Sequence, residues 1–412
     1  MSFSPRTSTR FSAQSALARS SRPDRVREVD VLRGFALLGI LLVNVQFTAG
    51  PQSGLVGEVV ESPVDGAAGW LVTALLVSAK FYLPFSFLLG YSFTLQLADA
   101  EHQGAAQAPR HLRRVICLFL LGVAHAVLLF VGDILMAYAC LSLLLFAARD
   151  LAPRKALRIA AWLLAGLFVF LLARGLLTLA TTELVHTPDA VAAARETAKE
   201  TAKETAEAYR GDPVSVVRAN LRALRGALAA NILYAADMLA AFLVGLAAGK
   251  HAVLAEPDRH RTQMKRIVAY GLPIGLAGGA FLAMCDHGPL DARWYYVAMA
   301  AQMVTGPALV AAYCCGLLLL LGGTRLGRRV GDVLAPAGRM SLTNYLTQSL
   351  VMALVFTGYG LGLYGRVGTV AVLAGCLVLY AAQLAFSAWL MGRTRYAPVE
   401  WLLRTATLAR KP

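Results

Sequence analysis

"GVAHAVLLFVGDILMAYA", residues 122–139, is apolar almost throughout, yet it carries His125 and Asp133. A helix of about 17 to 25 apolar residues can span the hydrocarbon core of a bilayer. Of the 412 residues, 58% are hydrophobic and only 15% are charged, and the mean hydropathy is +0.59. This composition excludes an ordinary soluble domain and predicts an all-α fold, a polytopic membrane helical bundle.

Ten apolar runs are long enough to be membrane spans. They begin near Val29, Gly69, Val115, Asp133, Leu157, Ala229, Ile267, Tyr295, Met340 and Val367. We expect Gly132 to break the helix and to begin a tight turn on the outer side. This turn would place Asp133 at the outer mouth of the bundle and His125 about two helical turns below it.

Basic residues test the order of these spans, because short cytoplasmic loops are rich in Lys and Arg. The clusters fall within residues 6–27, 110–114, 149–158, 250–266, 325–329 and 393–411. With ten spans all of them lie on one side, so both termini are predicted to be cytoplasmic. The intervening segment 50–68 contains Glu58, Glu61 and Asp65 but no Lys or Arg.

The net charge of +15 is therefore explained by anchoring to the inner leaflet of the lipid bilayer. A basic patch with interleaved aromatic residues is absent, so nucleic acid is not a predicted partner. The six cysteines lie in or beside apolar spans with no C-x-x-C pair and no His at metal spacing. No metal site is predicted.

Two polar segments divide the chain. Residues 1–27 are rich in Ser, Arg and Ala and predict a disordered cytoplasmic tail. The alternative interpretations are a transit peptide or the basic region of a secretory signal, but the apolar run that follows is too long for a typical cleaved signal core. Residues 183–228 contain "ETAKETAKETAE" and predict a solvated helical excursion on the outer side. Five spans lie in residues 28–182 and five in residues 229–412.

Ionisable residues occur at membrane depth in several spans. Lys80 lies about 16 Å into the second span, and Asp237 about two turns from the outer end of the sixth. Each charge at such depth costs roughly 2.5 to 3.5 kcal/mol. Together with His125 and Asp133 they predict a shared polar pocket; in the alternative interpretation Lys80 and Asp237 only neutralise one another.

A second polar group is predicted at the cytoplasmic face. Asp30 and Arg33 share one face of the first span, and Arg339 and Asn344 lie at the start of the ninth. An aspartate near a helix start also suits the helix dipole. Arginine binds phosphate, so Arg33 would hold a lipid phosphate or a phosphorylated cofactor.

Five motifs in order carry a resemblance to a known family. They are "VDVLRGFALLGILLVN", "KFYLPFSFLLGYSF", "LLGVAHAVLLFVGDILMAYA", "GRMSLTNYLTQSL" and "RTRYAPVEWLLR". Together they resemble the YeiB-like family of bacterial membrane proteins, whose carboxy-terminal half is domain of unknown function 418. The resemblance extends from about Arg27 to Arg404 and implies a multi-pass protein of the bacterial plasma membrane.

This family is distantly similar to the transmembrane acyltransferases, through "D-x-x-R-G" in the first span and "F-x-F-x-x-G" in the second. That group includes the lysosomal heparan glucosaminide acetyltransferase and the bacterial sugar O-acetyltransferases. The similarity implies acyl-CoA as a cytosolic co-substrate and a small-molecule or glycan acceptor across the membrane. A homodimer is compatible with it.

Acyl transfer needs a general base, a group that orients the base, and a donor for the oxyanion. We assign His125 as base or transient acyl carrier, Asp133 or Asp237 as its orienting group, and Lys80 as oxyanion donor. Arg33 and Arg339 would steer the pyrophosphate of coenzyme A, beside Asp30 and Asn344.

Two other functions use the same residues. A secondary transporter would use Lys80, His125 and Asp237 as a proton or substrate site. A non-catalytic scaffold would use the polar residues only to join helices.

Overall fold

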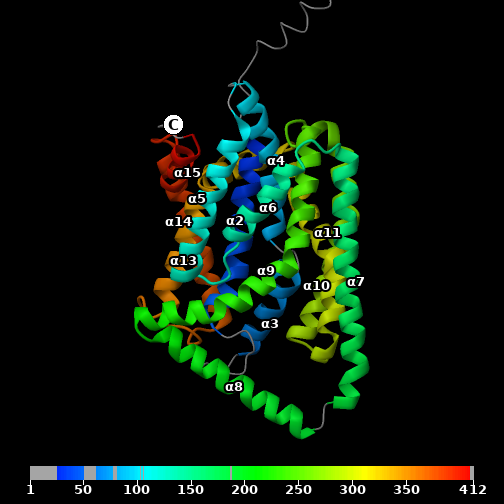
Figure 1. Ribbon diagram of the computed structural model, residues 1–412, viewed down its shortest axis with the longest axis vertical. Helices are drawn as coiled ribbons and strands as arrows, with labels where there is room; N and C mark the ends of the chain where they lie inside the picture. The colour runs from blue at the N-terminus through cyan, green and yellow to red at the C-terminus, as the bar shows by residue number, and fades with distance from the viewer. Residues whose placement is uncertain are drawn as a thin grey trace, which may run out of the picture.

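The computed structural model describes residues 26–50, 62–77, 81–102, 104, 106–185 and 188–408. Every regular element in these ranges is a helix, which confirms the all-α prediction. Lys80 lies outside the described residues, as does nearly all of the predicted tail, residues 1–27. The helices run mostly side by side along the long axis of the molecule (Figure 1).

The amino-terminal helices are α2 (Arg27–Thr48), α3 (Pro63–Val72), a π-helical turn (Thr73–Val77), α4 (Tyr82–His102), α5 (Gln107–Leu128), α6 (Leu135–Ala147) and α7 (Pro153–Val185). The next two are α8 (Pro188–Arg210) and α9 (Pro213–Lys250). The remainder are α10 (Arg261–Asp286), α11 (Tyr295–Leu321), α12 (Arg325–Arg339), α13 (Ser341–Phe356), α14 (Thr369–Met391) and α15 (Pro398–Leu408), with short 3₁₀ turns at Pro257–His260 and Ala292–Trp294.

Seven of the described helices are long and apolar enough to cross a membrane: α2, α5, α7, α9, α10, α11 and α14. The protein is thus an integral membrane protein. Three of the ten predicted spans do not form one long helix. The second predicted span is divided between α3 and α4, and the fourth and ninth correspond to α6 and α13, which have only 13 and 16 residues. Ten crossings and cytoplasmic termini remain predictions.

The α5–α6 hairpin differs from the expected pair of complete spans. At 1.5 Å per residue, α6 is about 20 Å long, whereas the hydrocarbon core is about 30 Å thick. Asp133, expected at the outer mouth, is fully buried in the turn between the two helices. Asn231 Nδ2 of α9 donates a hydrogen bond to its backbone carbonyl at 3.1 Å.

Small residues allow the closest helix contacts. A Cβ on Gly338 of α12 would collide with the backbone carbonyl of Asp30, and one on Gly34 would collide with that of Leu334. Gly90 of α4 and Gly245 of α9 form a second crossing of this kind, against Phe242 and Phe87 respectively. Such contacts replace the hydrophobic driving force that is missing between helices in lipid. They fix α2 against α12 and α4 against α9.

The predicted hydrophilic excursion, residues 183–228, corresponds to α8 and the first half of α9. These segments lie at the end of the bundle opposite the C terminus (Figure 1). The helix α9 continues without interruption from Pro213 to Lys250. The expected boundary at residue 228 therefore falls inside one helix. The division into two five-span halves stays a prediction.

Candidate functional site

A cavity of about 760 Å³ opens at the end of the bundle where α2 begins and α15 ends, since Val26 and Leu408 both line it. Its walls come from α2, α4, α5, α6, α12, α13 and α15. The described lining includes six arginines, namely Arg33, Arg110, Arg114, Arg339, Arg395 and Arg404, and three acidic residues, namely Asp30, Asp99 and Glu400. The mouth of this cavity is therefore strongly cationic.

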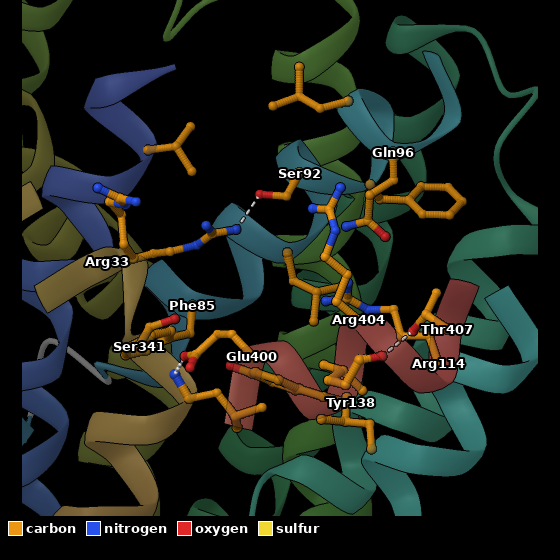
Figure 2. Close-up of a pocket in the computed structure, with 18 of the residues that line it drawn as sticks. Arg33, Phe85, Ser92, Gln96, Arg114, Tyr138, Ser341, Glu400, Arg404 and Thr407 are labelled. Atoms are coloured by element: carbon orange, nitrogen blue, oxygen red, sulfur yellow. Dashed lines mark hydrogen bonds between the residues drawn. The ribbon is translucent and has the colours of Figure 1, made fainter. Parts of the chain in front are cut away.

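Partners of Arg33 lie on both α2 and α4. Its Nη2 donates to Ser92 Oγ of α4 at 2.6 Å (Figure 2). Its Nη1 lies 3.4 Å from Asp30 Oδ1, one turn earlier in α2. The ion pair follows from the spacing of three residues, which places both side chains on one helical face. Arg339 lines the same cavity, so the structure brings three of the four residues predicted to bind a cofactor together.

Asn344, the fourth predicted residue, has another position. Its side chain is buried outside the cavity lining, and its Nδ2 donates to Ala337 O at 3.2 Å and Ser387 Oγ at 3.0 Å. Gln348, one turn later, donates to Gln383 Oε1 at 2.9 Å. These amides join α13 to its neighbours, so a direct cofactor contact of Asn344 is not part of this geometry.

Arg114 belongs to the cavity although the sequence assigned it only to a topological cluster. Arg33, Arg114 and Arg404 reach the same space from α2, α5 and α15 (Figure 2). Within the described part of the chain, Arg114 has no hydrogen-bond or carboxylate partner, and it lies within range of charge repulsion from Arg33. An anion between the two guanidinium groups would remove this repulsion. The available sequence signal was the four-residue spacing of Arg110 and Arg114 on one helical face.

The helix α15, which forms one wall of the cavity, is attached to α13 by a single carboxylate. Glu400 Oε1 accepts hydrogen bonds from the backbone N–H of Leu342 at 2.8 Å and of Thr343 at 3.1 Å, and Oε2 accepts from Thr343 Oγ1 at 2.5 Å. A helix N-terminus carries unpaired N–H groups and a partial positive charge, so a carboxylate stabilises it. Glu400 therefore fastens the carboxy-terminal wall to the start of α13.

The cavity becomes apolar and aromatic as it enters the bundle. His111 stacks on Phe146 with ring centroids 4.9 Å apart, and its Nε2 lies 2.9 Å from Ser142 O. Deeper lining comes from Ile134, Leu135, Tyr138 and Tyr345. Ile134 directly follows Asp133, so this end of the cavity adjoins the polar pair at the α5–α6 turn.

His125 and Asp133 form a buried dyad. His125 Nδ1 lies 2.8 Å from Asp133 Oδ1, and the two residues are 2% and 0% exposed. Asp133 Oδ2 accepts a hydrogen bond from the backbone N–H of Met136 at 2.8 Å, in the first turn of α6. The start of a helix favours the ionised carboxylate.

This geometry assigns the proton on the imidazole. An ionised carboxylate only accepts hydrogen bonds, so in a contact with ionised Asp133 the proton of His125 is on Nδ1, which leaves Nε2 of a neutral ring as an acceptor. Nε2 is buried and has no hydrogen-bond partner among the described residues. The ring of Tyr345, which lines the cavity, lies 5.1 Å from the imidazole, between centroids. Tyr345 thus contacts the dyad and also lines the cavity.

Asp237 lies in a different polar group. It is 1% exposed, and Tyr82 Oη donates to its Oδ2 at 2.8 Å. Tyr138 Oη in turn donates to the backbone carbonyl of Tyr82 at 2.7 Å and lines the cavity. Of the two carboxylates predicted to orient His125, Asp133 is the one that contacts it. The predicted partner Lys80 lies outside the described residues.

The described ranges contain no group of three or more His, Cys, Asp or Glu side chains arranged to hold a metal ion.

The helical bundle, the cationic cavity and the buried dyad together describe a polytopic membrane protein with a polar cavity inside the bundle. The family model described as "Protein of unknown function (DUF418)" matches residues 248–410. YxaH of Bacillus subtilis (strain 168), an uncharacterized protein, is 31% identical over 93% of this chain and 94% of its own length. The chain belongs to this YeiB-like DUF418 family, as its motifs predicted.

Two further relatives are similar over nearly the whole chain. YeiB of Escherichia coli (strain K12), also uncharacterized, is 31% identical over 92% of this chain and 95% of its own length. An uncharacterized 39.9 kDa protein from Bacillus acidopullulyticus is 28% identical over 94% and 95% respectively. No solved structure matches the chain.

Proposed function

We propose that this protein transfers an acyl group from a cytosolic acyl-CoA to an acceptor supplied from the membrane or its far side, in the bacterial plasma membrane. One observation carries the proposal. A cavity lined by six arginines adjoins, through Ile134 and Tyr345, a buried His–Asp dyad whose Nε2 has no hydrogen-bond partner among the described residues.

The cavity suits a long ligand with phosphates at one end and a reactive group at the other. Guanidinium groups bind phosphate oxygens in pairs, and Arg33 and Arg114 approach one space from two helices. Coenzyme A has a diphosphate, a 3′-phosphate and a thioester at the end of a flexible arm. With its phosphates at the arginines, the thioester would extend toward Tyr138 and Tyr345 at the apolar end.

The dyad would move the proton. Nε2 of His125 takes the proton from the hydroxyl or amine of the acceptor molecule. At the same time the oxygen or nitrogen of that group attacks the thioester carbonyl. Asp133 stabilises the imidazolium ion that forms. The tetrahedral intermediate then expels the coenzyme A sulfur, which receives the proton from His125, and the acyl group remains on the acceptor.

Two residues complete the proposal. Tyr345 covers the imidazole, so ligand binding has to displace its ring before Nε2 reaches the substrate. Lys80 remains the proposed donor to the oxyanion. The acceptor, a small molecule or glycan, would approach from the side opposite the arginine-lined mouth.

The test uses purified protein in nanodiscs with radiolabelled acetyl-CoA and extracted cell-envelope acceptors. For Arg33→Gln with Arg114→Gln we expect at least a tenfold loss of acetyl-CoA binding. For His125→Ala we expect binding to remain and label transfer to disappear. Arg325→Gln and His260→Ala, both outside the cavity lining, are the matched controls. Full transfer by a folded His125→Ala variant would exclude the dyad as the base.

A second candidate function, secondary transport, is favoured by Asp237. This carboxylate is buried at membrane depth and joined to the cavity through Tyr82 and Tyr138, although acyl transfer at the dyad does not need it. A transporter would use it as a proton site together with Lys80 and His125. Flux into proteoliposomes without acyl-CoA, lost in Asp237→Asn, would support this function instead.

A further inference from the structure

The first half of α9 has an apolar stripe that no other described element covers. Val214, Leu221, Leu228 and Ile232 are 60%, 51%, 41% and 77% exposed. At 100° per residue these side chains lie within a narrow sector of the helix. The opposite side, with Val216, is buried against the bundle. The exposed sector therefore faces either water or lipid.

Three arginines border this stripe. Arg218, Arg222 and Arg225 follow each other at spacings of four and three residues, so they form one row beside the apolar residues. All three are exposed, and none has a hydrogen-bond or carboxylate partner among the described residues. On the adjacent helix α8, by contrast, a basic side chain is paired with a carboxylate, since Lys199 lies 3.8 Å from Glu196.

The first half of α9 runs across the bundle before the helix turns along it (Figure 1). It lies with α8 at the end opposite the C terminus. A transverse helix with adjacent apolar and cationic stripes matches the geometry of a helix in the plane of a membrane interface. The apolar stripe enters the acyl region, and the arginines remain at the level of the headgroups.

We propose that residues 213–232 are an interfacial helix that binds the phosphates of anionic phospholipids in the leaflet at this end of the bundle. Guanidinium groups pair with phosphate oxygens, and the row offers three without competing carboxylates. The charges also lack a topological explanation, because the predicted outer side of a membrane protein is normally poor in Arg.

The proposed lipid site is physically connected to the dyad. Asn220 Nδ2, on the buried side of the same segment, donates to Val127 O at 3.1 Å, and Asn231 Nδ2 donates to Asp133 O at 3.1 Å. The helix thus holds both ends of the turn that carries His125 and Asp133. Lipid binding itself does not depend on acyl transfer, so the inference stands apart from the proposed function.

Lipid binding is measured by native mass spectrometry of the detergent-solubilised full chain with added dioleoyl phosphatidylglycerol or dioleoyl phosphatidylcholine. For Arg218→Gln with Arg222→Gln we expect at least threefold fewer bound phosphatidylglycerol molecules and no change with phosphatidylcholine. The matched control, Lys199→Gln with Lys203→Gln, removes the same charge from α8 and should bind like the wild type. Equal effects of the two variants, or none, would overturn the proposal.

The depth of the apolar stripe in the membrane is measured separately, in bilayers that contain brominated phosphatidylcholine and phosphatidylglycerol. A tryptophan added by Leu221→Trp should be quenched by the brominated chains, whereas one added by Thr201→Trp on α8 should not. The native tryptophans are common to both variants, so the difference from the wild type reports the added residue. Quenching at residue 221 no stronger than at residue 201 would place the stripe in water and reject the interfacial helix.

Discussion

At the scale of single residues, the central feature is the pair of hydrogen bonds that the Asp133 carboxylate makes, one with each oxygen. Asp133 Oδ1 contacts His125 Nδ1, and Oδ2 accepts the backbone N–H of Met136. One side chain therefore orients the imidazole and begins α6. The two roles can be separated by replacing Asp133 with asparagine. The amide of asparagine keeps one oxygen acceptor and has an NH₂ donor in place of the other oxygen.

Asp133→Asn tests the orientation of the imidazole. The amide oxygen remains with Met136 N–H, so the NH₂ group faces His125 Nδ1 and forces the proton onto Nε2. We expect acyl transfer to fall by at least about 100-fold with little change in thermal stability. Radiolabel transfer in nanodiscs and thermal unfolding measure the two effects. Asp133→Ala, which also removes the helix cap, should lower stability by about 1 to 2 kcal/mol; transfer unchanged in both variants would exclude an orienting role.

Part of the site was predictable residue by residue. Asp30 and Arg33 could be paired from their spacing, and His125 and Asp133 were recognisable as polar groups in an apolar run. The choice between Asp133 and Asp237 was not predictable, because Tyr82, an aromatic residue in an apolar span, is what holds Asp237 elsewhere.

At the scale of elements, the α5–α6 hairpin depends on a close approach of the two helices. A Cβ on Gly122 of α5 would lie 2.8 Å from Asp133 Oδ2 and 2.7 Å from the backbone nitrogen of Met136. Both groups belong to the dyad's capping arrangement and cannot move without loss of their hydrogen bond. Gly122 is therefore a requirement of the hairpin.

Gly122→Ala should destabilise the protein by about 1 to 3 kcal/mol, the usual cost of overpacking, and should reduce transfer because Asp133 is displaced. Gly166→Ala is the matched control, since a Cβ there meets nothing within 4 Å in helix α7. We expect the control to be neutral or slightly stabilising, because alanine favours helix more than glycine. Denaturant unfolding in detergent compares them; equal stability of the two variants would contradict this packing argument.

The attachment of α15 is a second feature at this scale. Three hydrogen bonds to Glu400 join α15 to the start of α13 across 57 or 58 positions of sequence. Nothing local to residues 398–408 indicates this partner. The wall of the cavity therefore follows from a long-range contact.

Glu400→Ala should release α15 from α13. We expect at least tenfold faster amide hydrogen exchange at Leu342 and Thr343, and faster exchange in residues 398–408, because two backbone donors lose their acceptor. Glu256→Ala removes an exposed carboxylate that pairs with Arg259 and serves as control. Exchange at Leu342 and Thr343 as slow as in the wild type would mean that another contact holds α15.

At the scale of the whole molecule, the two ends of the bundle differ in charge and in contents. One end contains the arginine-lined mouth and the last residues of α15. The other contains α8 and the transverse half of α9 (Figure 1). The distribution of Lys and Arg predicts that the first end is cytoplasmic.

This orientation is tested by thiol labelling of intact cells with a membrane-impermeant maleimide. A cysteine at Thr201 of α8 should react in intact cells, whereas one at Arg329 of α12 should react only after permeabilisation. Both positions are exposed, and the wild type with its six cysteines gives the background. The reverse pattern would invert the topology and exclude a cytosolic donor at the arginine-lined mouth.

The sequence by itself determined the class of the protein. Whether a segment is stable in a bilayer depends on its summed transfer energy and on hydrogen bonds within its own helix, and both are local properties. The spacing of residues along one helix likewise placed Asp30 beside Arg33. Hydropathy and spacing therefore identified the helical membrane bundle and the side chains that share a face.

The tertiary structure alone decided which faces meet. Helices in lipid associate where small residues permit contact, as Gly338 permits at Asp30, and no single segment encodes its partner. These contacts brought Arg114 to Arg33, gave Asn344 a structural role, and selected Asp133 as the partner of His125. The site is the product of pairings between distant segments, whereas the class of the protein follows from each segment separately.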